Sequence, residues 1–334
     1  MENIYHGIDF HSTQSTIETV SNGINSQEHT RLTLRTDEYD SKLYPLLSKN
    51  SIVCIEALNG SFELAHRIRP HVAEVYILNP TDIKISNKKT DKVDARKLVN
   101  MLKYHFESND PDSHFPIVYI PERYIIQLRS LFSTDKILKK QIVSYKNRIH
   151  SIFKSYLITV TRNDVRGGKL FTLLDNTSLP ETAISEIKLL RRLQENVEIE
   201  RKNLQDEIIS LACKHCWDEI SLLISIPGLS LLGACAIMAD VGDIKRFSSA
   251  KKLASYLRSV PTVKSSNERI HIGGITKRGR KLSYELILQG IEHTIKYSLP
   301  LNKFFEEKIK GKRRVVVRAA IVRKVIESIF YIFQ

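Results

Sequence analysis

Two hydrophobic periods alternate over the first hundred residues. Short apolar or alternating runs predict strands at residues 4–10, 15–20, 31–35, 52–55 and 72–78. Helical spacing occupies residues 62–68, and Thr90 can act as the N-cap of a further helix that runs to about residue 104. A loop that contains proline and aspartate follows over residues 105–120. The pattern therefore predicts an α/β domain over residues 1–120.

The next hundred residues carry two long stretches with apolar residues at alternating spacings of three and four. They cover residues 128–156 and 187–211. Polar residues interrupt the apolar positions at Asp135, Gln194 and Arg201. Residues 163–168 between the stretches are typical of a turn. We therefore expect an antiparallel coiled-coil arm over residues 121–218, which could join two domains of one chain or two chains.

The remaining residues, 219–334, predict a compact and mostly α-helical domain. Near its start, residues 226–233 (Ile-Pro-Gly-Leu-Ser-Leu-Leu-Gly) resemble a helix-hairpin-helix turn. In such a turn, backbone N–H groups at a helix N-terminus can hold a DNA phosphate. The same residues also fit an ordinary glycine-containing turn between two helices.

Four carboxylates of the first domain form a pattern that is typical of catalysis: Asp9, Glu56, Asp91 and Asp94. The first two lie at or near the ends of apolar runs, where burying an unpaired charge is costly. The last two are three residues apart and share one face at the start of a helix, where they could also simply offset the helix dipole. Hard divalent cations need clustered oxygen ligands, and two such ions can clamp a reacting phosphate. The pattern predicts a Mg²⁺ site that acts on phosphodiesters.

The order of strands and helices in this domain is the one expected of an RNase H-like α/β fold. That fold would bring Asp9, Glu56 and the helix that begins near Asp91 together beside the central strands. The sequence therefore predicts one site from residues that are far apart along the chain.

Charge is distributed unevenly along the chain, whose formal net charge is +14. Residues 251–334 hold 19 Lys and Arg against 6 Asp and Glu, whereas residues 1–100 hold 12 against 13. Such a basic segment indicates a polyanion partner, most often nucleic acid, although a solvated basic face has the same composition. We expect no membrane span and no signal peptide, and the four cysteines favour a reduced, intracellular protein.

A second candidate site lies in the basic segment. Ser265 and Ser266 fall in an expected polar loop, and cations follow where a helix is expected to start. The helix dipole disfavours cations there, but a bound phosphate would reverse that penalty and use the free N–H groups. A serine in such a pocket could attack phosphorus, although most loop serines are merely solvated. Nucleic-acid contacts are expected from Lys264, Arg269, Lys277, Arg278, Arg280 and Lys281.

Two smaller features have two interpretations each. Cys213 and Cys216 have the spacing of half a zinc site, but no second Cys/His pair accompanies them, so packing near a helix end is the alternative. His6 and His11 flank Asp9 and could support metal ligands or be polar edge residues.

Several motifs together resemble the IS-one-ten family of insertion-sequence transposases, which includes the Piv-type DNA invertases. The match covers nearly the whole chain. In the first domain the similar segments are Gly7-Ile-Asp9, Cys54-Ile-Glu56-Ala and Thr90-Asp-Lys-Val-Asp94-Ala-Arg96, the last being the most specific. In the last domain they are Ser225-Ile-Pro-Gly, residues 242–256 and Ile275-Thr-Lys-Arg-Gly.

This resemblance implies a RuvC-like domain whose DEDD carboxylates bind Mg²⁺, and a serine that forms a covalent phosphoserine link to DNA. It implies a composite site with the serine of a partner subunit, in a homo-oligomer that ranges from a dimer to a tetrameric synaptic complex. It also implies a noncoding bridge RNA that selects donor and target DNA, and a cytoplasmic, nucleoid-associated protein of a prokaryote.

Within the resemblance, Ser266 matches the family's serine. Asn267 stands where the family usually has glycine, and the loop to Lys277 can differ by one residue, so Ser265 stays an alternative. Residues 57–60, Ala-Leu-Asn-Gly, also depart from the more usual Ala-Thr-Gly, while Glu56 itself is retained.

The resulting hypothesis is an enzyme: a bridge-RNA-guided DNA recombinase that acts as a transposase. Asp9, Glu56, Asp91 and Asp94 would hold Mg²⁺, and Ser266 would attack phosphorus. The nearest alternative is a metal-only nuclease similar to a Holliday-junction resolvase, in which water attacks. A further alternative is a nucleic-acid-binding protein whose carboxylates no longer catalyse.

Overall fold

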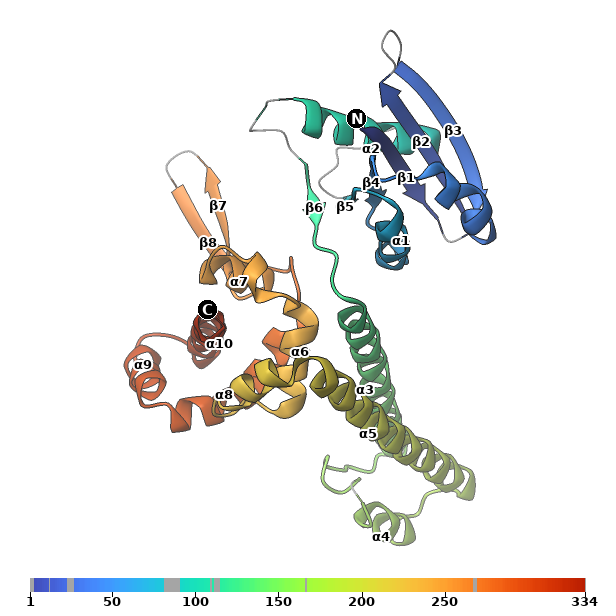
Figure 1. Cartoon of the computed structure of the whole chain (residues 1–334). Helices are drawn as coiled ribbons and strands as arrows, with labels where there is room; N and C mark the ends of the chain where they lie inside the picture. Colours follow the sequence, from blue (N-terminus) through green and yellow to red (C-terminus); the bar gives the residue numbers. More distant parts are fainter. Residues whose placement is uncertain are drawn as a thin grey trace. The chain divides into compact units, whose positions relative to one another are not determined.

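Two compact units make up the chain, Met1–Pro121 and Glu122–Gln334 (Figure 1). The computed structural model describes residues 3–11, 13–22, 27–80, 91–108, 110, 115–165, 167–266 and 269–333. None of the described helices has the length and apolar content that crossing a membrane requires.

The first unit is built on a six-stranded mixed sheet with the strand order β3-β2-β1-β4-β5-β6. Its strands are β1 (Ile4–Phe10), β2 (Gln14–Asn22), β3 (Gln27–Arg35), β4 (Ser51–Glu56), β5 (Glu74–Leu78) and β6 (Ile117–Val118). Strands β1, β2 and β3 pair antiparallel, β4 runs parallel to β1 and β5 to β4, and β6 is antiparallel to β5. The predicted α/β character of this region is confirmed.

The helices of this unit are α1 (Ser61–Ile68) and α2 (Asp91–Glu107), with short helical turns at Thr36–Glu38, Tyr39–Leu43, Tyr44–Leu46 and Arg69–His71. The sheet has two apolar faces, because successive residues of a strand point to opposite sides. One face, which includes Ile8 and Ile55, packs against α1. The other, which includes Tyr5 and Cys54, packs against α2.

The second unit is mostly helical, as predicted. Its helices are α3 (Arg123–Ser155), α4 (Lys169–Asp175), α5 (Glu181–Ile224), α6 (Leu231–Val241), α7 (Ala250–Tyr256), α8 (Leu282–Tyr297), α9 (Leu299–Ile309) and α10 (Arg314–Ile332), with a short turn at Ile244–Arg246. A two-stranded antiparallel hairpin of β7 (Pro261–Ser266) and β8 (Arg269–Ile275) lies between α7 and α8 in the sequence. Helix α6 is mostly apolar, is buried around most of its circumference and forms the centre of the core.

Helices α3 and α5 lie side by side and run antiparallel (Figure 1). At one end, the ring of Tyr124 stacks on that of His215. Toward the other end, Arg148 forms an ion pair of 2.7 Å with Glu186. Helix α5 extends well beyond the stretch predicted for it, and the non-helical backbone of Cys216 marks a kink within it.

The polar residues that interrupt the apolar positions of α3 and α5 form hydrogen bonds and an ion pair with other polar residues of these two helices. The carboxylate of the largely buried Asp135 accepts a hydrogen bond of 2.8 Å from Gln205 and lies 2.9 Å from the Arg201 guanidinium. Gln194 is also buried, and its side-chain amide donates to Glu198 at 3.0 Å. The residues that break the apolar pattern therefore have polar partners within the pair, which removes most of the cost of burying them.

Close backbone contact joins the turn before α6 to α8. A Cβ atom at Gly290 would lie only 1.7 Å from the carbonyl oxygen of Gly228, and Gly228 itself has a φ of +86°. Thr294 donates from its hydroxyl to the carbonyl of Pro227 at 2.8 Å. Packing against α8 thus accounts for the glycine of the turn that resembles a helix-hairpin-helix motif.

Replacing Gly290 should test this contact. We expect Gly290→Ala to lower the free energy of unfolding by about 3 kcal/mol, because the new methyl group meets backbone that cannot rotate away. Urea unfolding followed by the fluorescence of Trp217, the single tryptophan, reports on this unit. Gly311→Ala is the matched control, since its Cβ would enter open space, and it should change stability by less than about 0.5 kcal/mol. Equal effects of the two substitutions would contradict the packing argument.

Candidate active site

Strand register places Asp9 and Glu56 next to each other. The last paired residues of β1 and β4 are Ile8 and Ile55, so Asp9 and Glu56 are the next residue of each parallel strand. Neighbouring strands lie roughly 4.8 Å apart, and residues at the same register share a face. That face is the one covered by α2, because Tyr5 and Cys54 belong to it and alternate residues of a strand point the same way.

Helix α2 is held closely against this face. A Cβ atom at Gly7 would lie 2.5 Å from the carbonyl oxygen of Ala95 and 2.6 Å from the amide nitrogen of Val99. Earlier in β1, the ring centroid of Tyr5 lies 6.3 Å from that of Phe106 in the last turn of α2. Helix α2 therefore runs antiparallel to β1, and its first turns lie toward the end of the strand that carries Asp9.

Asp94 lies in that part of α2, one turn before the sheet-facing Leu98. Its Oδ1 atom is shielded from solvent and has no hydrogen-bond partner among the described residues. Arg96 anchors the same turn to the sheet, since its Nε atom lies 3.7 Å from a carboxylate oxygen of Glu18 in β2. Asp91 begins the helix, but its side chain lies outside the described residues.

Asp9 is almost completely buried, with 2% of its surface exposed. Its Oδ2 atom lies 3.4 Å from Nε2 of His11, which therefore neighbours the candidate site as one interpretation of the sequence had it. Glu56 ends β4 and is partly exposed. Among the described side chains, no three His, Cys, Asp or Glu residues approach closely enough to hold a metal ion. The structure brings the carboxylates to one end of one face without assembling a compact ligand cluster from the described members.

His6 lies on the opposite face of the sheet, so it does not support these carboxylates. Its ring nitrogens hydrogen-bond to the hydroxyls of Thr19 at 2.9 Å and Ser51 at 3.0 Å, and 1% of its surface is exposed. Burial lowers the pKa of His6 from 6.5 to about 4, because the charged ring would lose its hydration.

This shift predicts a loss of stability in acid. The unfolded chain binds a proton at His6 below pH 6.5, whereas the folded protein does so only below about pH 4. Stability from this group is therefore fully present above pH 6.5 and is lost as the pH falls toward 4. Between pH 7.5 and 5 we expect a contribution of about 2 kcal/mol.

Urea unfolding at the two pH values, followed by circular dichroism, measures this effect. His6→Gln should remove it, so the variant should lose about 2 kcal/mol less than the unsubstituted protein between pH 7.5 and 5. The difference between the two proteins excludes the contribution of the carboxylates to the pH dependence of stability, because the same carboxylates are present in both. Identical pH dependence of the two proteins would contradict the assignment to His6.

The candidate nucleophiles lie in a strand and not in the predicted loop. Ser265 and Ser266 are the last two residues of β7, and their backbones pair with Ile270 and Arg269 of β8. Residues 261–264 and residues 269–272 each alternate apolar and polar, which is a strand signal that the loop prediction overlooked. For Lys264, Ser265, Ser266 and Arg269 the structure describes the backbone alone.

The basic cluster lies directly after this hairpin. Lys277 and Arg278 are exposed in the turn that leaves β8, and Arg280 and Lys281 precede α8. The expected helix start after a run of cations is thus present. Its N-terminus already has an internal anionic partner, however, because Asp240 accepts hydrogen bonds from the backbone N–H of Ser283 at 2.9 Å and from its hydroxyl at 2.8 Å.

Asp240 and Arg129 are polar residues of this region that the sequence reading missed. Asp240 is 3% exposed, and burial raises its pKa. Arg129 of α3 donates to the carbonyls of Ala239 at 2.7 Å and Asp240 at 3.1 Å. Burial, and then the charge of Arg280, lower the pKa of Arg129 to about 10. A carboxylate inside the apolar run of α6 was the available signal for Asp240.

The cysteine pair fits the packing interpretation. Cys216 is buried, and its thiol donates to the carbonyl of Ala212. Burial raises the pKa of this thiol to about 12, so it is a protonated core residue at neutral pH. Cys213 packs against the same core.

Comparison with known proteins gives a consistent set of relatives. Residues 220–305 match the family described as "Transposase IS116/IS110/IS902 family", a match that runs from the end of α5 into α9. The transposase for insertion sequence element IS1328 of Yersinia enterocolitica is 22% identical over 241 residues, covering 71% of this chain and 69% of that protein. The transposase for insertion sequence element IS1111A of Coxiella burnetii is 22% identical over 259 residues, covering 75% and 67%.

A putative transposase of Sinorhizobium fredii, y4pF/y4sB, is 20% identical over 276 residues, covering 80% of this chain and 67% of that protein. These alignments extend far beyond residues 220–305, so the similarity is not confined to the last domain. Together with the motifs around Asp9, Glu56 and Asp94, they lead to one assignment. The family match over residues 220–305 and these relatives support an IS110-family transposase.

Proposed function

We propose that this transposase cuts and rejoins DNA with a serine nucleophile and a set of carboxylates that hold Mg²⁺. The observation that carries the proposal is the register of the first sheet, which makes Asp9 and Glu56 neighbours beneath the first turns of α2. A metal-dependent phosphoryl-transfer site requires such convergence of oxygen ligands from separate elements.

The first unit supports an RNase H-like, RuvC-like assignment. Three antiparallel strands are followed by two strands parallel to β1, and helices pack on both faces. The carboxylates lie where the central strands β1 and β4 end. In an open sheet with parallel strands, the carboxyl ends of those strands are the usual place for a site.

The residues present fit a divalent cation. All four candidate ligands are carboxylates, which are the donors that Mg²⁺ prefers. Asp9 is buried, and the shielded Oδ1 atom of Asp94 has no hydrogen bond among the described residues, so a ligand would satisfy it. Asp9, Glu56, Asp91 and Asp94 would hold the ion. When bound, the cation would stabilise charge on the scissile phosphate and on the leaving 3′ oxygen.

The chain's own nucleophile would be Ser266, with Ser265 as the alternative. Its hydroxyl oxygen forms a bond to phosphorus while the bond from phosphorus to the 3′ oxygen breaks, and the hydroxyl proton passes to that leaving oxygen. The phosphoserine link is itself a phosphodiester, so it conserves the free energy of the broken DNA bond. Rejoining is the same exchange in reverse and needs no external energy source. The hairpin position, next to the basic residues 277–281, suits a serine that receives a phosphate.

The carboxylates and the serine belong to two different units of the chain. We propose that the active site is completed between subunits of a homo-oligomer, from a dimer to a tetramer, and that α3 and α5 act as a coiled-coil arm. The basic last domain would hold the DNA backbone, and a noncoding bridge RNA would select the target and donor sequences. These partners rest on the family resemblance and on the concentration of cations in residues 251–334.

Trapping an intermediate tests the mechanism. A substrate with a nick near the cleavage site loses the strand that would rejoin, so a protein–DNA covalent adduct should accumulate in the presence of Mg²⁺. The adduct should survive denaturation and disappear after protease treatment. Cleavage without any adduct would replace this proposal with the metal-only nuclease, in which water attacks. The absence of both cleavage and adduct, with DNA binding intact, would favour a binding protein.

A further inference from the structure

A pocket of about 290 Å³ lies in the second unit between α3 and the segment that leads into α8. Four cations line it, together with two carboxylates. The cations are Arg129 and Lys136 of α3 and Arg280 and Lys281 before α8, and the carboxylates are Asp240 and Glu285. The site joins residues from two distant parts of the sequence, and the Arg129 and Lys136 contributions fall outside the basic segment recognised in the sequence.

The segment that supplies Arg280 and Lys281 is fixed in place. Gly279 has a φ of +99°, and a Cβ atom there would lie 2.4 Å from the carbonyl oxygen of Tyr256. The same carbonyl accepts a hydrogen bond of 2.7 Å from the Arg280 amide, and Arg258 donates to the carbonyl of Gly279 at 2.6 Å. The pocket wall is therefore preorganised, which lowers the cost of ordering it around a ligand.

The cations exceed the requirements of their protein partners. Arg129 is occupied by the carbonyls at the end of α6, and Lys281 forms an ion pair of 2.6 Å with Glu285. Within the described residues, the side chains of Lys136 and Arg280 make no hydrogen bond or ion pair. Asp240 is engaged by the amide and hydroxyl of Ser283. The pocket therefore has two cations in excess, held near the charge of Arg129.

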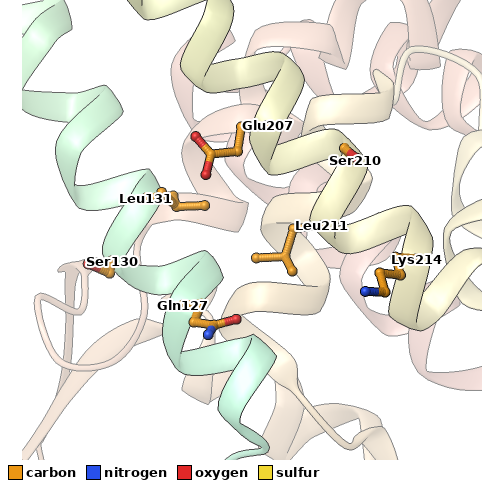
Figure 2. Close-up of a pocket in the computed structure, with 7 residues that line it drawn as sticks. All are labelled: Gln127, Ser130, Leu131, Glu207, Ser210, Leu211 and Lys214. Atoms are coloured by element: carbon orange, nitrogen blue, oxygen red, sulfur yellow. The ribbon is translucent and has the colours of Figure 1, made fainter.

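Charge distinguishes this pocket from the larger one between α3 and α5, which Figure 2 shows. The larger pocket is lined by Gln127, Ser130, Leu131, Glu207, Ser210, Leu211 and Lys214. Its one acid balances its one base, and the other five lining residues are uncharged. It has no excess charge with which to select an anion.

We propose that the pocket between α3 and α8 binds a backbone phosphate of DNA, with Lys136 and Arg280 as its direct contacts. The inference rests on the proposed function in one respect, namely that the protein acts on DNA. A compact anion with several acceptor oxygens matches a lysine and an arginine that converge on one cavity. Because residues 276–280 leave β8 directly, the bound phosphate would position DNA beside the base of the serine hairpin.

Salt-dependent DNA binding by the full chain tests the proposal. We would measure Kd for a nonspecific duplex by fluorescence anisotropy in EDTA, between 0.1 and 0.4 M KCl, so that strand cleavage does not contribute. Lys136→Gln and Arg280→Gln should each lower the slope of log Kd against log salt by about 0.9 and weaken binding roughly fivefold at 0.15 M. Arg280→Lys, which keeps the charge, should retain most of the slope.

Lys140→Gln is the matched control, because it removes the same charge from the exposed side of α3 one turn later, outside the pocket. It should leave the slope unchanged. If the two cations share one phosphate, the double variant Lys136→Gln with Arg280→Gln should lose less than the product of the single effects.

Unchanged slopes in both single variants, or an equal loss in Lys140→Gln, would overturn the proposal. If the substitutions at Lys136 and Arg280 weakened binding only to single-stranded RNA of the same length, the assignment of the pocket to DNA would be overturned. The assay involves neither the metal nor the serine, so the failure of the cleavage mechanism would leave this result untouched, and the reverse also holds.

Discussion

Asp9→Asn is expected to reduce DNA strand cleavage by roughly a thousandfold, which corresponds to about 4 kcal/mol of lost transition-state stabilisation. Asparagine has nearly the same volume as aspartate but supplies no negative charge to a cation. Asp9 is buried at the end of β1, and Glu56 occupies the corresponding position at the end of the neighbouring strand β4. The substitution should therefore remove a metal ligand while the sheet stays intact. Cleavage of an end-labelled substrate in Mg²⁺ gives the rate, and DNA binding in EDTA should be largely retained.

The matched control is Glu18→Gln. Glu18 is an equally buried carboxylate on the same face, opposite Gly7 in the register, but it is paired with Arg31 at 2.8 Å. Its loss should lower thermal stability and, because Glu18 also contacts Arg96 in the turn of Asp94, reduce cleavage per folded molecule far less than Asp9→Asn does. If Asp9→Asn cleaves normally, or if both substitutions abolish cleavage equally while folded, the carboxylate assignment is wrong.

Ser266→Ala should eliminate the covalent protein–DNA adduct on a nicked substrate, lowering it at least about a hundredfold, because alanine has no nucleophilic oxygen. Ser265→Ala should only weaken the adduct. The two serines are consecutive residues of one strand, and consecutive strand positions belong to opposite faces. A single phosphate should therefore depend on one serine and not on both.

The pair of variants is its own control, since both remove one hydroxyl from the same hairpin. An adduct that persists in Ser266→Ala and vanishes in Ser265→Ala would move the nucleophile by one residue. Recombination that persists in both variants would exclude the serine mechanism and favour attack by water.

The local pattern of apolar and polar residues was sufficient to predict most strands and helices of the first unit. Residues 4–10 were predicted as a strand, and β1 has the same bounds, since a short apolar run at the centre of a sheet is buried on both faces. Convergence of Asp9 and Glu56 was predictable only through the expected topology. Their neighbouring register depends on the pairing of β1 with β4, which lies 47 residues further along the chain.

Other features depend on tertiary contacts that a local pattern does not encode. Helix α4 (Lys169–Asp175) is too short to be stable alone and packs against the apolar cluster that includes Phe153. The hydrogen bond of Arg129 to Asp240 joins residues 111 apart, and the cap that Asp240 gives to Ser283 joins residues 43 apart. The serine hairpin was mistaken for a loop because its two alternating segments are short and are joined by the polar residues 264–269.

The partly buried ion pair of Asp135 and Arg201 restricts how the length of the arm can vary in evolution. Inserting seven residues into α3 alone, between this pair and α6, would keep the apolar stripe but leave both charges without their counterparts, at a cost of roughly 3–5 kcal/mol. Equal insertions or deletions in both helices on the side of α4 would leave the pair matched. Homologues with arms of other lengths should therefore differ between residues 136 and 200, and in α3 and α5 together.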